Sequence, residues 1–462
     1  KEELQMGERA LKLMMDVLSQ PAVLIAAISL IGLLLQKKPA NEIVKGTTKS
    51  FLGFIVISAG AGILVGSLEP FGKMFQAAFH VNGVVPNNEA IVAMALNEYG
   101  TATALIMFFG MLSNILIARF TRLKYIFLTG HHTLYMACLI AVILAVAGLK
   151  GPFLIGVGAV SLGLTMSVFP AMVQPFMKKI TGNDKVAFGH FSSIGYAVSG
   201  LIGKAAGKGS RSTEKIRFPK GLGFLRDSSV SIALTMTILY VLIALFAGAG
   251  YVERELSGGT HYLVFSVIQA VTFAAGVFII LSGVRLVLAE IVPAFKGISD
   301  KLVPDSKPAL DCPIIFPYAP NAVLIGFFCS FIGGITGMLI LGAAGAVIVL
   351  PGVVPHFFTG ASAGVFGNAA GGIRGAVLGS FVNGLIITFF PVFLLPVMGD
   401  LGFANTTFSD TDFAATGIVL GHALKLLGAG GVVIGIAAVL AGAVLLGFKR
   451  GKAEKSDHKA EA

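Results

Sequence analysis

One charge-free stretch decides the fold class: CPIIFPYAPNAVLIGFFCSFIGGITGMLILGAAGAVIVLPGVVPHFFTGASAGVFGNAAGGI, residues 312–373. These sixty-two residues contain no Asp, Glu, Lys or Arg, yet prolines and glycine clusters interrupt them. A helix needs only about 20 apolar residues to cross a bilayer, so the stretch holds at least two crossings and some irregular backbone. Irregular backbone at membrane depth has to line a cavity enclosed by protein. The stretch therefore predicts discontinuous membrane helices around such a cavity.

The remaining sequence is typical of a polytopic membrane protein. Hydrophobic residues make up 55% of the 462 residues and charged residues only 12%, against about a quarter in soluble domains. Further charge-free windows, each long enough to cross once, are 17–36, 50–68, 99–118, 125–149, 151–177, 228–252, 256–284, 375–399 and 426–448. We therefore expect an all-α membrane protein of about eleven transmembrane helices. Shorter apolar segments at 186–203 and 356–372 are candidates for re-entrant hairpins.

Charge sets the expected orientation, because cationic loops stay on the cytoplasmic side of a membrane. The cationic segments are 37–49, 119–124, 178–185, 204–226 and the tail after Lys449. The mainly acidic segments, which we expect outside, are 69–98, 253–255 and 399–412. This asymmetry accounts for the net charge of +11, and no basic stripe carries base-stacking aromatics, so we expect no nucleic-acid partner. The seven cations of 204–226 fit either a topogenic loop on anionic lipid or a docking site for an acidic cytosolic partner.

A weak internal repeat is visible near half the chain length. The sequence LEPFGK at 68–73 resembles IVPAFK at 291–296. About five crossings separate the two copies, and an odd number inverts one copy relative to the other. We therefore expect inverted repeats within one integral membrane unit, residues 1–448, followed by a disordered cytoplasmic tail at 449–462.

Four polar clusters interrupt the apolar windows, where each polar group is costly unless it is paired or solvated. They are 129–135 with His131, His132 and Tyr135, 189–196 with His190, 311–321 with Asp311, Tyr318 and Asn321, and 357–368. A neutral imidazole can bind a hydroxyl group or take its proton near neutral pH. The alternative for a membrane histidine is a hydrogen bond to a neighbouring helix, and for Asp311 an ion pair with a cation. His132 points about 100° away from His131 on a helix, so we expect only one of the two at a site.

No cofactor or metal site is expected. Neither an HExxH motif nor a phosphate-binding GxxxxGK[ST] loop occurs in the sequence. The three cysteines, Cys138, Cys312 and Cys329, lack CxxC spacing and predict neither a disulfide framework nor a zinc site.

Several short motifs together carry a family resemblance over nearly the whole chain. They are LTGH at 128–131, FGH at 188–190, GVR and AE within 283–290, FKGIS at 295–299, LDC at 310–312, APNAV at 319–323, and GVFGN at 364–368 with GG and Arg374 beyond. At these positions the chain resembles the ascorbate-specific membrane permease subunit, enzyme IIC, of the bacterial phosphotransferase system.

The resemblance implies a homodimer in the bacterial inner membrane, in which each subunit interleaves a dimerisation domain with a core that carries the substrate. It also implies group translocation. A cytosolic enzyme IIB partner carries phosphocysteine and transfers the phosphate to L-ascorbate, so that ascorbate 6-phosphate is released inside. The phosphate donor thus lies on a partner protein, and the chain itself is the translocating subunit of a multi-component phosphotransferase. The charged product cannot readily recross the hydrocarbon.

Matching position by position, the resemblance places His131, His190 and Asp311 at the ligand, with His190 assisting deprotonation of the hydroxyl that is phosphorylated. Further candidates for substrate contact are Ser58, Asn88, Glu89, Tyr135, Tyr318 and Asn321. Family members carry glutamines shortly after the two histidines, where this chain has Tyr135 and Phe191. Another sugar acid or polyol is therefore the alternative substrate. The alternative class of protein is an ion-coupled secondary transporter with Asp311 and Glu89 as ion sites. Transport that does not depend on phosphoenolpyruvate would identify this class.

Overall fold

The computed structural model describes residues 21–79, 83–216, 228–403 and 405–460. The helices are α2 (Pro21–Leu35), α3 (Ala40–Phe79), α4 (Asn88–Phe120), α5 (Gly130–Val146), α6 (Gly151–Thr181), α7 (Ser193–Ala206), α8 (Ser228–Ala247), α9 (Ala249–Tyr251), α10 (Tyr262–Leu302), α11 (Pro320–Ala343), α12 (Val353–Pro355), α13 (Ala361–Leu394) and α14 (Thr411–Ala460). The strands are β1 (Gly83–Pro86), β2 (Tyr125–Phe127), β3 (Ala187–Phe188), β4 (Lys307–Leu310), β5 (Ile348–Val349) and β6 (Thr406–Thr407).

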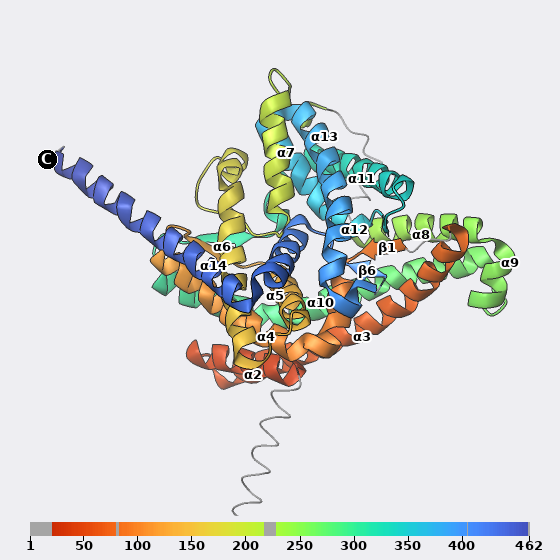
Figure 1. Cartoon of the computed structure of the whole chain (residues 1–462), viewed down its shortest axis with the longest axis horizontal. Coiled ribbons are helices and arrows are strands. Elements are labelled where there is room, and N and C mark those ends of the chain that lie inside the picture. The colour runs from red at the N-terminus through yellow and green to blue at the C-terminus, as the bar shows by residue number, and fades with distance from the viewer. Residues whose placement is uncertain (1–20, 80–82, 217–227, 404, 461–462) are drawn as a thin grey trace, which may run out of the picture.

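The helices form three groups around the short strands (Figure 1). α7, α11 and α13 stand together at the top of this view, and the long helices α3 and α10 run side by side below them toward α8 and α9. α4, α5 and α6 pack on one another, with α14 beside them. Buried apolar side chains of α4, α5 and α6 form the largest part of the core, and α5 is buried over nearly its whole length.

Two halves of the chain repeat the same order of elements. α3, β1 and α4 in the first half correspond to α10, β4 and α11 in the second, and each long first helix contains a proline, Pro70 or Pro293. β1 lies between β5 and β6, β4 lies between β2 and β3, and every pairing is parallel. The central strand of each half therefore pairs with two strands of the other half. The similar segments 68–73 and 291–296 occupy corresponding places in α3 and α10, which supports the predicted repeat.

α7, α11 and α13 touch backbone to backbone through glycines. A Cβ atom on Gly203 of α7 would lie 2.7 Å from the carbonyl oxygen of Gly367 in α13. A Cβ atom on Gly326 of α11 would lie 2.3 Å from the carbonyl oxygen of Gly360. Such distances leave no room for a side chain, so these three helices form one tightly packed group.

The helix α13 contains a sharp reversal. Gly371 and Gly372 have non-helical backbone angles, and φ of Gly372 is +58°. Beyond them the chain folds back, because Asn383 Nδ2 donates a hydrogen bond of 3.1 Å to Thr359 Oγ1. Residues 356–372 thus form the first arm of a helical hairpin, in one of the two segments where a hairpin was predicted.

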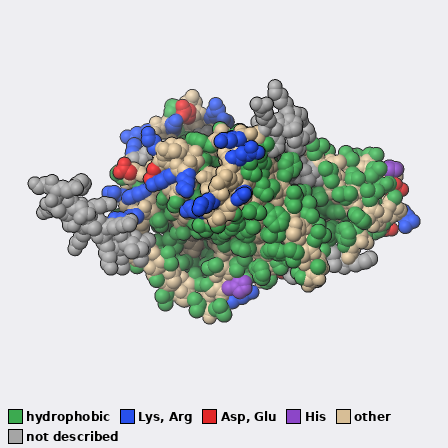
Figure 2. All heavy atoms as spheres, turned by 90° about the horizontal axis from the view of Figure 1, so that it is seen from above, with side chains coloured by type: hydrophobic (Ala, Val, Ile, Leu, Met, Phe, Trp, Pro, Cys, Tyr) green, Lys and Arg blue, Asp and Glu red, His purple; other side chains and the backbone are tan. Residues whose placement is uncertain are grey.

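Among the described residues, six helices are long and apolar enough to cross a membrane, or seven if the bent pair α8 and α9 is one span. The prediction of an all-α polytopic membrane protein is confirmed, whereas the count of eleven spans stays a prediction. Figure 2 shows a broad hydrophobic surface, with Lys and Arg grouped toward one end. α14 continues to Ala460 and so includes most of the tail that was predicted to be disordered.

The described part of the cationic loop, residues 204–216, is fixed to the core. The Glu214 carboxylate accepts hydrogen bonds from the backbone N–H groups of Asn321, at 3.0 Å, and Ala322, at 3.1 Å. These donors lie in the first turn of α11, where a negative charge is favourable. The one acidic residue of the loop therefore caps α11. The rest of the loop, 217–226, lies outside the described residues.

Candidate functional site

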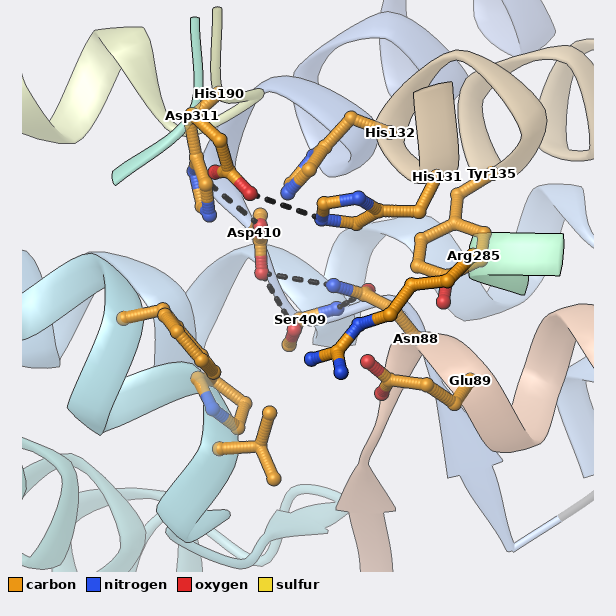
Figure 3. A pocket seen from close by; sticks show the side chains of 13 residues that line it. Asn88, Glu89, His131, His132, Tyr135, His190, Arg285, Asp311, Ser409 and Asp410 are labelled. Atoms are coloured by element: carbon orange, nitrogen blue, oxygen red, sulfur yellow. Dashed lines mark hydrogen bonds and ion pairs between the residues drawn. The ribbon is translucent and has the colours of Figure 1, made fainter. Parts of the chain in front are cut away.

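The ends of the short strands converge on one cavity. From the sheet centred on β1, the lining residues are Asn88 and Glu89 after β1, Val354 and Pro355 after β5, and Ser409 and Asp410 after β6. From the sheet centred on β4, they are His131, His132 and Tyr135 after β2, His190 after β3, and Asp311 after β4. Parallel strands bring their carboxyl ends to one edge of a sheet, which is where α/β proteins place their ligands. Arg285 of α10 and Phe358 complete the lining. The cavity has a volume of about 200 Å³, and Figure 3 shows its polar side chains directed toward a common space.

His131 and Asp311 form an acid–imidazole pair at the cavity wall. His131 Nε2 lies 3.4 Å from Asp311 Oδ2, and both side chains are partly exposed. Asp311 Oδ1 accepts a hydrogen bond of 2.7 Å from the backbone N–H of Cys312, which fixes the carboxylate at the end of β4. The pair can thus present an N–H donor and a carboxylate oxygen to one ligand.

His190 and Asp410 form a second, deeply buried pair. His190 Nδ1 lies 3.8 Å from Asp410 Oδ2 and 2.7 Å from the hydroxyl oxygen of Tyr196. Asp410 Oδ1 accepts hydrogen bonds from Asn88 Nδ2, at 3.0 Å, and from Ser409 Oγ, at 2.6 Å. The carboxylate is thus held by two donors while it faces the imidazole. This arrangement orients His190 as an acid–base group.

His132 also lines the cavity, contrary to the expectation that only one of the neighbouring histidines reaches it. The two rings stay close, with centroids 4.7 Å apart, and His132 lies 4.0 Å from the ring of His190. Its Nδ1 accepts a hydrogen bond of 3.3 Å from the backbone N–H of Phe191. The neutral ring therefore carries its proton on Nε2 and can only donate there.

Three overlapping groups of side chains are close enough to hold a metal ion. The first is His131 with His132 and Asp311; the second is His132 with His190 and Asp410; the third is His190 with Asp311 and Cys312. Two of these groups need His132, whose ring nitrogens have no free lone pair while Nδ1 accepts from the backbone. In the third, the thiol of Cys312 donates to the carbonyl oxygen of Phe358, at 3.9 Å, and accepts from Ser362, at 3.2 Å, so it is a neutral thiol rather than the thiolate that a metal binds. The donor set therefore suits a ligand with hydroxyl groups better than a metal ion.

The two departures from the family pattern have different surroundings. Phe191 is fully buried and stacks on Phe127 with ring centroids 4.5 Å apart, so its side chain packs beneath the site. Tyr135 lines the cavity, and its buried hydroxyl has no hydrogen-bond partner among the described residues. Because an unpaired buried hydroxyl is unfavourable, Tyr135 is available to a bound ligand.

The structure brings six of the predicted contact residues to this cavity and leaves three elsewhere. At the cavity lie Asn88, Glu89, His131, Tyr135, His190 and Asp311. Ser58 is exposed on α3 and bonds back to the carbonyl oxygen of Phe54. Tyr318 is half exposed, and the Asn321 side chain donates to the carbonyl oxygens of Thr213 and Ile216.

Asp410 and Asp412 do not stand out in the sequence as site residues, because the acidic segment 399–412 predicts an outward-facing loop. Both are buried, and Asp410 lines the cavity whereas Asp412 does not. The Asp412 carboxylate accepts from the backbone N–H groups of Ser193, at 2.7 Å, and Ile194, at 2.9 Å. The signal for a local role was the sequence SDTD at 409–412, since Ser, Thr and Asp are typical just before a helix.

Comparison with known proteins agrees with the motif resemblance. The family model described as "PTS system sugar-specific permease component" (EIIC-GAT) matches residues 16–412. The chain is also similar to the "Ascorbate-specific PTS system EIIC component" of Mycoplasma pneumoniae, with 24% identity over 415 residues. That match covers 79% of this chain and 63% of the relative's length. By the extent of the family match, the chain belongs to the EIIC-GAT family of PTS sugar-specific permease components.

Proposed function

We propose that this chain translocates L-ascorbate, with transport coupled to phosphorylation of the sugar acid. The observation that carries the proposal is the cavity at the six strand ends, where two acid–imidazole pairs, His131 with Asp311 and His190 with Asp410, face one space. These pairs offer alternating donors and acceptors, as a ligand with several hydroxyl groups requires.

The size of the cavity supports a small substrate. Sites for drug-sized ligands have volumes of about 300–1,000 Å³, and this cavity has about 200 Å³. A monosaccharide-sized sugar acid suits that volume better than a disaccharide. The name of the Mycoplasma pneumoniae relative points to ascorbate within this class.

His190 is the acid–base residue of the proposal. The oxygen of the substrate's primary hydroxyl attacks the phosphorus of a phosphocysteine on an enzyme IIB partner, the P–S bond breaks, and an O–P bond forms. The hydroxyl proton passes to Nε2 of His190, which requires the tautomer with its proton on Nδ1. In that tautomer Nδ1–H donates to the hydroxyl oxygen of Tyr196, 2.7 Å away, and the charge of Asp410, 3.8 Å from Nδ1, favours it. The phosphate ester is then released on the cytoplasmic side.

The assembly and the topology belong to the same proposal. We infer a homodimer in the bacterial inner membrane, with the C-terminus in the cytoplasm and the cationic loops on the side of the enzyme IIB partner. The grouping of Lys and Arg at one end of a largely hydrophobic surface supports this topology (Figure 2).

The test is uptake of labelled ascorbate into vesicles, with and without the phosphoenolpyruvate-driven relay, followed by identification of the internal label. We expect ascorbate 6-phosphate only when the relay is present. His190→Ala should abolish its formation, whereas His422→Ala, on the exposed part of α14, should not. Product formed by the His190→Ala protein at the normal rate would refute the role of His190.

One observation favours an ion-coupled transporter as the second candidate. Glu89 is buried at the cavity, and its Oε2 has no hydrogen-bond partner among the described residues. A buried carboxyl of this kind is typical of proton-coupled carriers. Unmodified ascorbate that accumulates with an ion gradient and without the relay would establish this class instead.

A further inference from the structure

Arg285 differs from the other polar residues of the cavity in its origin. The others follow the ends of short strands, whereas Arg285 lies within the long helix α10. It belongs to the part of α10, Tyr262–Val287, that is apolar and long enough to cross a membrane. Figure 3 shows its guanidinium group directed into the space beside Asn88 and Glu89. Its side chain is exposed, and an ionisable residue within a membrane span generally serves a function.

The guanidinium group of Arg285 has no partner among the described residues. Figure 3 shows Glu89 beside it, but no ion pair joins the two, and Glu89 Oε2 makes no hydrogen bond among the described residues. The carboxylates of Asp311 and Asp410 already face His131 and His190. Arg285 is therefore the one permanent cation in the lining of this cavity, and its charge is free for a ligand.

The position of Arg285 is fixed by a close helix crossing. Two residues earlier, a Cβ atom on Gly283 would lie 2.6 Å from the carbonyl oxygen of Gly53 in α3. A Cβ atom on Gly53 would in turn lie 2.7 Å from the carbonyl oxygen of Gly283. α10 is thus locked against α3 immediately before Arg285, so the cation is presented from a defined place.

The internal repeat shows that this charge is not a general feature of the fold. Arg285 lies eight residues before Pro293 in α10, and the residue eight before Pro70 in α3 is Gly62. A Cβ atom on Gly62 would meet nothing within 4 Å, so packing does not exclude a side chain there. Only the second half of the chain places a cation at this position.

We propose that Arg285 is the specificity residue that selects a negatively charged sugar acid over neutral sugars. This inference rests on the proposed function, in which the ligand is ascorbate. Ascorbate is a monoanion at neutral pH, with its charge shared between one enediol oxygen and the lactone carbonyl oxygen, and a guanidinium group binds anionic oxygens through charge-assisted hydrogen bonds. The acid–imidazole pairs bind the hydroxyl groups, which neutral sugars share, and Arg285 binds the charge.

The test compares two ligands of similar shape by calorimetric titration of the purified full-length chain in nanodiscs. L-Ascorbate carries the charge, and L-gulono-1,4-lactone has a similar ring and side chain without it. We expect the unchanged protein to prefer ascorbate. Arg285→Gln should weaken ascorbate binding about tenfold or more and change lactone binding less than about twofold. Arg285→Lys should restore part of the difference.

Two controls separate the alternatives. Arg254→Gln removes an exposed cation far from the cavity and should change neither affinity. If Arg285 only supports Glu89, then Arg285→Gln weakens both ligands equally and Glu89→Gln reproduces the effect, which overturns the inference. Equal binding of both ligands by the unchanged protein overturns it too. Because binding needs no relay, a failure of phosphorylation would refute the proposed function and leave this result standing, whereas binding of neither ligand refutes both.

Discussion

The buried carboxylate of Asp412 provides the sharpest test of how the site is held. Its two oxygens accept the backbone N–H groups of Ser193 and Ile194, at 2.7 and 2.9 Å, in the first turn of α7. Hydrogen bonds to charged groups contribute about 1.5–3 kcal/mol each. Asp412→Ala removes both and leaves two buried donors unpaired, so we expect a loss of about 3–5 kcal/mol in the local stability of α7.

Hydrogen exchange measured by mass spectrometry reads this loss directly. A decrease of about 3 kcal/mol in opening free energy accelerates exchange about 100-fold, and we expect this in peptides that cover residues 193–199. The effect should extend to function, because His190 lies three residues before Ser193. Substrate affinity should therefore fall as well.

The matched control is Asp400→Ala, which removes an exposed acid from the same acidic segment. It should change stability by no more than about 0.5 kcal/mol and leave exchange in α7 unchanged. Equal effects of the two substitutions, or unchanged protection of α7 in the Asp412→Ala protein, would show that the carboxylate does not anchor this helix.

Three further substitutions test the surroundings of the site. Gly372→Ala places a Cβ atom 2.4 Å from the carbonyl oxygen of Arg211 at a residue whose φ is +58°. In the control Gly182→Ala, φ is +71° and no atom lies within 4 Å of the new Cβ. The heat-unfolding midpoint of Gly372→Ala should therefore be well below that of Gly182→Ala. Burial raises the pKa of the Asp184 carboxyl, but hydrogen bonds from two lysines and a glutamine outweigh it and lower the pKa well below the usual value. A carboxyl with a lowered pKa stabilises the folded state above its unfolded pKa, near 4. The difference in midpoint between the unchanged protein and Asp184→Asn should therefore persist from pH 7 to about pH 4 and shrink at lower pH; a difference that already vanishes at pH 6 would contradict this. Glu214→Gln weakens the cap of α11 and should accelerate hydrogen exchange in its first turn, by a smaller factor than Asp412→Ala because this site is more exposed.

The sequence predicted the membrane class and the family but not the way the chain forms its cavity. Charge-free windows reveal helices because each span has to satisfy its own backbone groups in the bilayer. The strands have two to four residues each, so no alternating pattern is long enough to reveal them. Their pairing joins residues as far apart as Val85 and Thr406, which no local signal indicates.

The site residues show the same limit. The sequence predicts His131, His190 and Asp311 as site residues because polar groups in apolar surroundings need a partner, and the three line one cavity. The sequence does not predict Asp410 as a site residue, because two other acidic residues nearby indicate a solvated loop. Asn321 stood in a polar cluster, but its side chain holds the loop before α8. A polar residue in an apolar segment is expected to have a structural or a ligand-binding role, and the fold determines which of the two it has.

The exchanged strands of the two halves have a consequence for biosynthesis. β1 leaves the ribosome more than 260 residues before its partners β5 and β6, and β2 and β3 also precede their shared partner β4. Until the second half is inserted, β1 lacks its neighbours β5 and β6, and β2 and β3 lack β4, the strand that lies between them. Unpaired strand edges are unfavourable within a bilayer. We therefore expect the first half to be unstable on its own, and a chain cut near residue 258 should yield fragments that are stable only when they are made together.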